Sequence, residues 1–287
     1  MFYKKLTIMI SHHSSRLIWA CSHGFDDIAN ELMQKITTFN DIDYDNCTAL
    51  LYACDMELEE IALKLIPLMS NNAINQVNKI GETALICACS NKLVNVALEL
   101  IPRMSYNAIN QITRSGETAL YWACYHELSD IALELIPRTS NDIINKVDKC
   151  DKTVLIWTLS SKKCILGSEL EKIVYKLIQK MSNSGINQID QCNKTALIRA
   201  IELKLEDVVL NLISMMSDKA INCVDYTGAN ALIYACIYKL EKIALVLINN
   251  MTLKSINQID TYGADALYYA NEKNMTNVIN AIELVSL

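Results

Sequence analysis

The residue types in this chain that could do chemistry are its eleven cysteines and four histidines. Five of the cysteines recur at one position of a repeated pattern: Cys21, Cys54, Cys89, Cys124 and Cys236. Adjacent helices pack about 8–10 Å apart, too far for a disulfide between equivalent positions, so we interpret these cysteines as small buried apolar residues. Cys87 and Cys89 lack the second cysteine pair of a structural zinc site. The sequence therefore predicts no metal site.

Four other cysteines lie in loops and are better candidates for exposure: Cys47, Cys150, Cys192 and Cys223. Many free thiols are typical of a reducing compartment, so we expect the protein in the cytoplasm.

No arrangement of residues typical of an enzyme stands out. The histidines pair with no serine or cysteine in a way that the repeat would bring together. The chain has no glycine-rich phosphate loop, no Gly-x-Ser-x-Gly and no His-Glu-x-x-His. We therefore predict no catalytic residue and no cofactor.

Charge and hydropathy narrow the partners further. The net charge of −6 argues against nucleic acid, because phosphate neutralisation requires a basic face. No apolar run approaches the roughly 18 residues of a membrane helix, so no membrane partner is expected. The apolar stretch 6–10 is too short for a secretory signal. We interpret residues 1–14 as a segment that caps the first repeat.

The elements that position these residues come from an internal repeat. Thr-Ala-Leu, or a variant of it, returns every 35 residues except once, where the interval is 42. The repeats start near residues 15, 48, 83, 118, 153, 195, 230 and 265, the first of them degenerate. A fixed period in this range predicts a stack of small units. The seven extra residues, 161–167, fall between two helices, where they are either added contact surface or a tolerated surface bulge.

Each repeat shows apolar spacing typical of two short amphipathic helices, followed by Ile-Asn and a loop. Pro67, Pro102 and Pro137 recur near the end of the second helix and should loosen its last turn. Two residues before each Thr-Ala-Leu stands a residue type that tolerates a positive φ, which predicts a left-handed turn there. These residues are Asn46, Gly81, Gly116, Asp151, Asn193, Gly228 and Gly263.

Helix, turn, helix and an extended loop with a left-handed turn resemble the ankyrin repeat. The resemblance rests on the Thr-x-Leu start, the Ala-Cys pair three residues after that Leu, second helices spelled IALKLI or VALELI, and the loop Ile-Asn-x-(Val/Ile)-(Asn/Asp)-x-x-Gly. It implies an all-α fold over residues 15–287: an ankyrin-repeat solenoid of about eight helix-turn-helix units joined by hairpin-like loops.

The chain departs from the family pattern in two places. Ala or Val replaces the proline that usually follows the Thr. The usual histidine, two residues further on, is replaced by Leu51, Ile86, Tyr121, Ile156, Ile198, Ile233 and Tyr268, which favours apolar packing over a polar network. The residue usage, rich in Ile, Asn, Lys, Tyr and Cys, is similar to that of ankyrin proteins encoded by giant DNA viruses of amoebae. That resemblance implies a protein located in a host cell.

Candidate binding residues lie at positions that can vary without harming the stack. We define the first-helix row as the residues four after each Thr: Trp19, Tyr52, Cys87, Trp122, Trp157, Arg199, Tyr234 and Tyr269. The loop tips add Tyr44, Lys79, Arg114, Lys149, Tyr226 and Tyr262, and the ends of the first helices add Tyr125, His126 and Tyr238. The row should line the concave side of a solenoid, since it lies about 200° from the buried Leu. Its side chains either contact a partner or pack under the loop of their own repeat.

These patterns favour a non-enzymatic scaffold that binds one unidentified partner protein on its loop-tip and first-helix face, and that acts as a monomer. The alternative is an adaptor that recruits a host ubiquitin ligase or otherwise interferes with a host pathway. Viral ankyrin proteins often resemble such adaptors but carry a C-terminal recruitment motif, for which we expect no room after the last helix.

Overall fold

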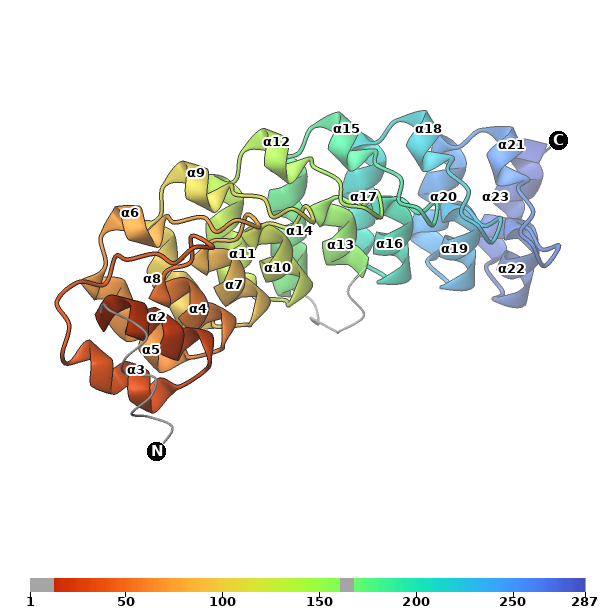
Figure 1. Ribbon diagram of the computed structural model, residues 1–287. Coiled ribbons are helices and arrows are strands. Elements are labelled where there is room, and N and C mark those ends of the chain that lie inside the picture. The colour runs from red at the N-terminus through yellow and green to blue at the C-terminus, as the bar shows by residue number, and fades with distance from the viewer. Residues whose placement is uncertain (1–12, 161–167, 287) are drawn as a thin grey trace. The chain divides into compact units, whose positions relative to one another are not determined.

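The computed structural model describes residues 13–160 and 168–286, so the predicted insertion 161–167 and most of the predicted cap 1–14 lie outside the described residues. The chain divides into two compact halves, Met1–Ser140 and Asn141–Leu287. Both are helical (Figure 1). Within the described residues the β pairing consists of isolated bridges in the C-terminal half, such as Val224 with Asn230. The predicted all-α fold is confirmed.

From the second repeat onward, the first helix begins directly after the Thr, Asn or Asp that opens the repeat. In the N-terminal half the first helices are α2 (His13–Ser22), α4 (Ala49–Asp55), α7 (Ala84–Ser90) and α10 (Ala119–Tyr125). In the C-terminal half they are α13 (Val154–Ser160), α16 (Ala196–Glu202), α19 (Ala231–Ile237) and α22 (Ala266–Glu272). Neighbours within a half pack side by side, as α4 packs on α7 and α7 on α10.

The Thr of Thr-Ala-Leu is the N-cap of that helix. Thr48 Oγ1 accepts a hydrogen bond from Leu51 N at 3.1 Å, which satisfies one of the free amides of the first turn. Asn230 and Asp265 stand where other repeats have Thr, and their side chains accept the same bond. The recurring Thr is thus a capping requirement that Asn and Asp also meet.

The second helices differ between the halves because of proline. In the N-terminal half they are α3 (Asp26–Met33), α5 (Glu59–Leu65), α8 (Val94–Leu100) and α11 (Ser129–Leu135), the last three followed by 3-10 turns η1 (Ile66–Leu68), η2 (Ile101–Arg103) and η3 (Ile136–Arg138). Pro67, Pro102 and Pro137 lie in those turns, which confirms the predicted loosening. Without proline, the second helices of the C-terminal half continue as α-helix: α14 (Ser168–Lys180), α17 (Glu206–Met215), α20 (Glu241–Asn250) and α23 (Thr276–Ser286).

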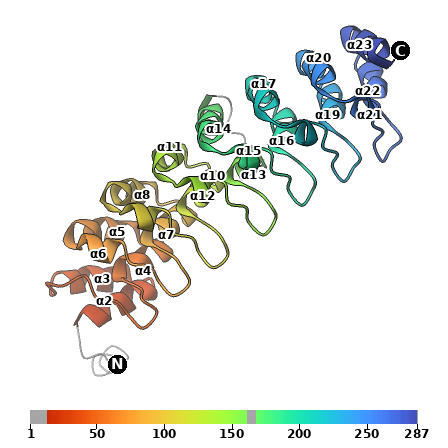
Figure 2. The same cartoon turned by 90° about the horizontal axis from the view of Figure 1, so that it is seen from above.

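A third helix of four residues precedes the loop of each repeat from the second to the seventh, and the sequence prediction missed it. In the N-terminal half it is α6 (Asn71–Ile74) and α9 (Tyr106–Ile109), and in the C-terminal half α12 (Asn141–Ile144), α15 (Asn183–Ile186), α18 (Asp218–Ile221) and α21 (Leu253–Ile256). Its signal was the Ser or Thr before it, since Ser70 Oγ accepts from Ala73 N at 3.3 Å as an N-cap. Figure 2 shows that, within each half, the first helices lie between the second helices and the loops.

The asparagine of each Ile-Asn joins consecutive repeats. Asn110 Oδ1 accepts from Ser140 N at 2.6 Å, and its Nδ2 donates to Tyr106 O at 2.8 Å. The same pattern holds in the C-terminal half, where Asn222 Oδ1 accepts from Thr252 N at 3.0 Å. A short side chain with both an acceptor and a donor is required, which explains why the residue is Asn at every repeat.

The predicted left-handed turns are confirmed at all seven positions, with φ from 55° at Asn193 to 95° at Gly116. A second left-handed position, between the two helices of a repeat, was not predicted. It has φ of 70° at Gly24, but elsewhere it is occupied by larger residues, Glu57, Lys92, Glu127, Lys204, Lys239 and Asn274. Such residues are strained there by about 1–2 kcal/mol each, because Cβ approaches the following carbonyl.

The repeated cysteines pack in the core as predicted: Cys21, Cys54, Cys89, Cys124 and Cys236 are all buried. None of the described cysteines forms a disulfide. Cys150 and Cys192 are exposed and Cys223 is half-buried, but the expected exposure of Cys47 is wrong. The side chain of Asp43 accepts the Cys47 N–H and holds the residue inward. Burial raises the pKa of Cys21 and Cys236 to about 12, which keeps these thiols protonated.

Candidate interaction surface

Most members of the first-helix row are hydrogen-bonded to the loop of their own repeat. Cys87 is buried, and the other members of the row are half-buried. Five of them hydrogen-bond an aspartate nine residues earlier in the chain. The bonds join Tyr52 Oη to Asp43 Oδ2 at 2.8 Å, Trp157 Nε1 to Asp148 Oδ2 at 2.7 Å, Arg199 Nη2 to Asp190 Oδ2 at 3.1 Å, Tyr234 Oη to Asp225 Oδ2 at 2.7 Å and Tyr269 Oη to Asp260 Oδ2 at 2.7 Å.

The second oxygen of the same aspartate shapes the loop. Asp225 Oδ1 accepts from Thr227 N at 2.8 Å and from Ala229 N at 3.2 Å, so one carboxylate ties the turn to the helix. Burial alone would raise the pKa of Asp225, but hydrogen bonds from Thr227 and Tyr234 and the charge of Lys194 lower it. The bond to Asp260 is the main cause that raises the pKa of Tyr269 to about 12. Packing under the loop, one of the two predicted roles, is therefore present, while partner contact stays a prediction.

A charged network connects two repeats of the C-terminal half. Lys194 Nζ lies 2.5 Å from Glu202 Oε1 and 3.6 Å from Asp225 Oδ2. It also donates to Tyr234 Oη at 2.9 Å and lies 4.6 Å from the centre of that ring. Arg199, itself a member of the row, contacts Glu202 at 3.3 Å. The side chains of Lys194 and Arg199 are only 15% and 18% exposed, so solvent screens these pairs less than surface pairs.

The row is interrupted twice, in the third and fourth repeats. Where the other loops have Asp, these have Asn78 and Thr113, and the matching row members are Cys87 and Trp122. The Trp122 indole N–H makes no hydrogen bond within the described part of the chain. Instead, Trp122 stacks on His126 with ring centres 5.5 Å apart and an interplanar angle of 14°.

We define the α10 cluster as Tyr121, Trp122, Tyr125 and His126. Tyr125 meets the Trp122 ring edge-on at 5.6 Å and is 45% exposed. Three of the four residues were predicted as binding residues, and the structure brings them together at the C-terminal end of α10. Tyr121 was missed as a binding candidate because the sequence placed it at the position usually taken by the family's histidine.

Three predicted tyrosines of the loop tips are strongly exposed: Tyr44 at 81%, Tyr226 at 68% and Tyr262 at 84%. In the N-terminal half neighbouring tips bond through the backbone, as Lys79 N donates to Asp45 O at 3.0 Å. Lys79 Nζ also lies 5.2 Å from the Tyr44 ring centre and 3.5 Å from Asp45 Oδ1. Arg114 and Lys149 are exposed. The tips therefore present the predicted aromatic and basic groups.

Two predicted residues lie in smaller ring clusters of their own. Trp19 packs on His23 with ring centres 4.5 Å apart, beside Phe25, whose side chain is 42% exposed. Tyr238 is half-buried and stacks on Tyr234 at 6.3 Å.

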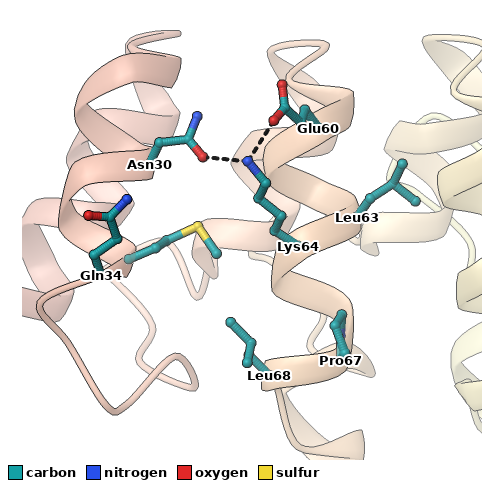
Figure 3. Close-up of a pocket in the computed structure, with 8 residues that line it drawn as sticks. Asn30, Gln34, Glu60, Leu63, Lys64, Pro67 and Leu68 are labelled. Atoms are coloured by element: carbon teal, nitrogen blue, oxygen red, sulfur yellow. Dashed lines mark hydrogen bonds and ion pairs between the residues drawn. The ribbon is translucent and has the colours of Figure 1, made fainter.

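A groove of about 640 Å³ lies between α3 and α5, on the second-helix side (Figure 3). Lys64 Nζ spans it by donating to Asn30 Oδ1 at 2.9 Å and contacting Glu60 at 2.6 Å. In the next repeat Arg103 Nη2 bonds Met69 O at 2.9 Å and closes the equivalent space. In the groove between α3 and α5, the residue equivalent to Arg103 is Leu68. Its side chain is 50% exposed and has no such donor, so this groove stays open.

Within the described ranges 13–160 and 168–286, no group of three or more His, Cys, Asp or Glu side chains is placed to hold a metal ion. None of the helices there combines the length and apolar character that a membrane span requires.

Comparison with known proteins identifies the repeat. A family model described as "Ankyrin repeats (3 copies)" matches residues 62–148 and 163–257, more than half of the chain. No curated protein sequence matches the chain significantly. Among solved structures, a chain from the Bd0816 predatory endopeptidase of Bdellovibrio bacteriovorus in complex with immunity protein Bd3460 is similar. It has 23% identity and a TM-score of 0.49, over 69% of this chain and 96% of that one. Because the family model matches more than half of the chain, this chain belongs to the ankyrin-repeat family.

Proposed function

We propose that this protein is a non-enzymatic scaffold that binds a partner protein on the face formed by its loop tips and first helices. Ankyrin repeats typically serve protein–protein interaction, which supports the general role. The observation that supports the place is the α10 cluster. Trp and Tyr are enriched in the few residues that carry most of an interface's binding energy. Here they lie together, with a half-buried Trp122 whose N–H has no loop carboxylate to bind.

The row members that bond an aspartate have a different role in this proposal. Trp157 donates to Asp148 and has Lys152 Nζ 4.0 Å from its ring centre, so it holds its own loop in place. A partner would have to break those contacts to use the polar edge of Trp157. We therefore assign partner contact first to Trp122, Tyr125 and His126, and support of the loop to Trp157.

The wider setting is also part of the proposal. Every described cysteine is a free thiol, which favours a reducing compartment such as the cytoplasm. If the protein acts in a host cell, as the residue usage of giant-virus ankyrin proteins would imply, the partner is a host protein. Recruitment of a ubiquitin ligase is then one outcome that identification of the partner would reveal. We propose that the scaffold itself is a monomer.

The test begins with proximity labelling in the source cells, followed by measurement of the affinity of the purified partner by calorimetry. Trp122→Ala is expected to weaken binding by about 2 kcal/mol or more, roughly 30-fold. The control is Tyr106→Ala, which removes a more exposed ring (59%) from α9 in the same half, outside the proposed face. It should leave the affinity unchanged.

Circular dichroism of each variant shows whether the fold survives the substitution. A folded Trp122→Ala variant with full affinity would remove the α10 cluster from the proposal. The absence of any protein partner, together with turnover of a small molecule, would refute the scaffold role itself.

A further inference from the structure

A second feature of the N-terminal half lies where the row is interrupted at Cys87. A cavity of about 290 Å³ opens between the loops of the second and third repeats. Its lining includes the Tyr52 ring and three carboxylates, Asp45, Asp55 and Glu82. Lys79 is the one cationic residue that lines it, and its ammonium already lies 3.5 Å from Asp45 Oδ1.

The carboxylates of this cavity are not equally satisfied. Glu82 Oε2 accepts from Asn78 Nδ2 at 2.9 Å, whereas the Asp55 carboxylate makes no hydrogen bond or ion pair within the described residues. Partial burial raises the pKa of Asp55, which means that its charge is incompletely solvated. An acidic cavity with an unpaired carboxylate at its rim would gain from a cation.

The C-terminal half contains a homologous site at the equivalent position between two repeats. The residue before the capping Thr is Cys47 in one repeat and Lys194 in the other. Seven residues after that Thr stand Asp55 and Glu202, respectively. Lys194 places its ammonium 2.5 Å from Glu202, beside the Asp225 carboxylate and the Tyr234 ring.

The two sites share one matching carboxylate, Asp55 for Glu202, but Cys47 replaces Lys194, Asn78 replaces Asp225 and Tyr52 replaces Arg199. Cys47 is buried and has no charge, and its thiol is 3.9 Å from Asp45 O, so it cannot substitute for a lysine. Cys87 stands where the other site has Tyr234, which removes a ring and leaves further room. The N-terminal site thus keeps the helix-end carboxylate, has Glu82 and the Tyr52 ring where the other site has Ala229 and Arg199, and lacks the ammonium of Lys194.

We propose that the cavity between the second and third loops binds the side-chain cation of a lysine from the partner protein, in the position that Lys194 occupies in its own site. The charge complementarity of Asp55 and Glu82 and the face of Tyr52 provide the attraction. This inference rests on the proposed function, because it specifies the chemistry of one anchor on the partner. An arginine would satisfy the same charges with a wider, planar head.

The experiment uses the purified full chain and three blocked tripeptides, Gly-Lys-Gly, Gly-Arg-Gly and the uncharged Gly-Gln-Gly. Amide chemical shifts are followed by NMR as each peptide is added. We expect saturable shifts around Asp55 and Glu82 with the lysine peptide, weaker or equal shifts with the arginine peptide, and none with the glutamine peptide. The shifts should diminish as salt is raised, since the site is open to solvent.

Two variants test the assignment from opposite directions. Asp55→Asn with Glu82→Gln keeps the shapes of both side chains, and should weaken the lysine peptide at least about fivefold. Lys194→Ala empties the homologous site, and should add a second set of saturable shifts around Glu202 that the unaltered protein lacks. Glu134→Gln, an exposed carboxylate on α11, is the control for charge alone and should change nothing.

Equal shifts with the lysine and glutamine peptides would overturn the inference, and so would full affinity in the folded double variant. These results are separate from the test of the scaffold. If partner binding depends on Trp122 but the lysine peptide does not bind, only the lysine site in the cavity is refuted. If the lysine peptide binds but no protein partner exists, the lysine site is supported and the scaffold role is refuted.

Discussion

The left-handed glycines offer a direct measurement of how tightly neighbouring loops pack. Gly81 and Gly116 occupy the same position in consecutive repeats, with φ of 90° and 95°. A Cβ added at Gly81 would lie 2.7 Å from Ile112 O and 3.1 Å from Thr113 Cα, both backbone atoms of the next loop. A Cβ at Gly116 would meet nothing within 4 Å. Alanine at the two sites therefore separates backbone strain from inter-loop contact.

The magnitudes follow from three effects. A non-glycine residue at positive φ costs about 1–2 kcal/mol in the folded state. Alanine also restricts the unfolded chain, which returns about 0.4–1 kcal/mol, so Gly116→Ala should destabilise by about 0.5–1 kcal/mol. Overpacking against backbone that cannot rotate away adds about 1–3 kcal/mol, so Gly81→Ala should destabilise by about 1.5–4 kcal/mol.

Urea unfolding, followed by far-UV circular dichroism, gives both values, and Gly228→Ala with Gly263→Ala repeats the comparison in the other half. An added Cβ at Gly228 would lie 2.9 Å from Asp260 Cα, whereas at Gly263 it meets nothing within 4 Å. Hydrogen exchange at Thr113 should show where the loss occurs, because destabilisation in a repeat protein is felt mainly by neighbouring repeats. Equal destabilisation at Gly81 and Gly116 would refute the packing of the two loops described here.

Three further predictions test other parts of the structure. Lys92→Gly should stabilise the fold by about 0.5–1 kcal/mol, visible as a higher Tm, because glycine relieves a left-handed residue (φ 60°) whose side chain makes no hydrogen bond or ion pair among the described residues. No change in Tm would contradict this strain. Asn187→Ala should lower the free energy of unfolding by about 1–3 kcal/mol and accelerate hydrogen exchange of the Ser217 amide, which loses its acceptor at 2.7 Å. Unchanged exchange of that amide would argue against the asparagine connection between repeats. The folded-state pKa of Asp225 is depressed, so its contribution to stability is complete above its unfolded pKa of about 3.9 and is lost as the pH falls through the folded value. In Asp225→Asn, the urea midpoint should therefore depend less steeply on pH below about pH 4. An unaltered slope of midpoint against pH would contradict this assignment.

Much of the fold follows from the sequence because the period repeats local requirements. Thr48 and its equivalents, the left-handed glycines and the Ile-Pro turns each act within a few residues, so pattern and structure agree. The asparagine bonds were missed because their acceptors and donors lie 30 residues apart, in the next repeat. Their identity was visible in the sequence, but the reason for it requires two repeats side by side.

The binding residues were harder to predict for a related reason. At sequence level Trp122 and Trp157 are the same position with the same residue, and both were assigned to partner contact. What separates them is the residue nine positions earlier, Thr113 in one case and Asp148 in the other. An aspartate there could have indicated a bonded ring, since aspartate coincides with Tyr, Trp or Arg in five repeats. Cys47 was misplaced because loop position alone does not show which way the Asp43 side chain turns the backbone.

This pairing leads to a general criterion for where an ankyrin protein of this kind can bind. A row side chain that is bonded to its own loop is already satisfied, and a partner that displaces the loop must first break that bond. Binding gains most where the chain leaves groups unsatisfied, because new contacts there replace only water. The described residues break the pattern at Asn78 with Cys87 and at Thr113 with Trp122, on the adjacent helices α7 and α10 (Figure 1). One interruption opens the acidic cavity and the other presents the α10 cluster, so a single partner with a lysine and an apolar side chain would contact both.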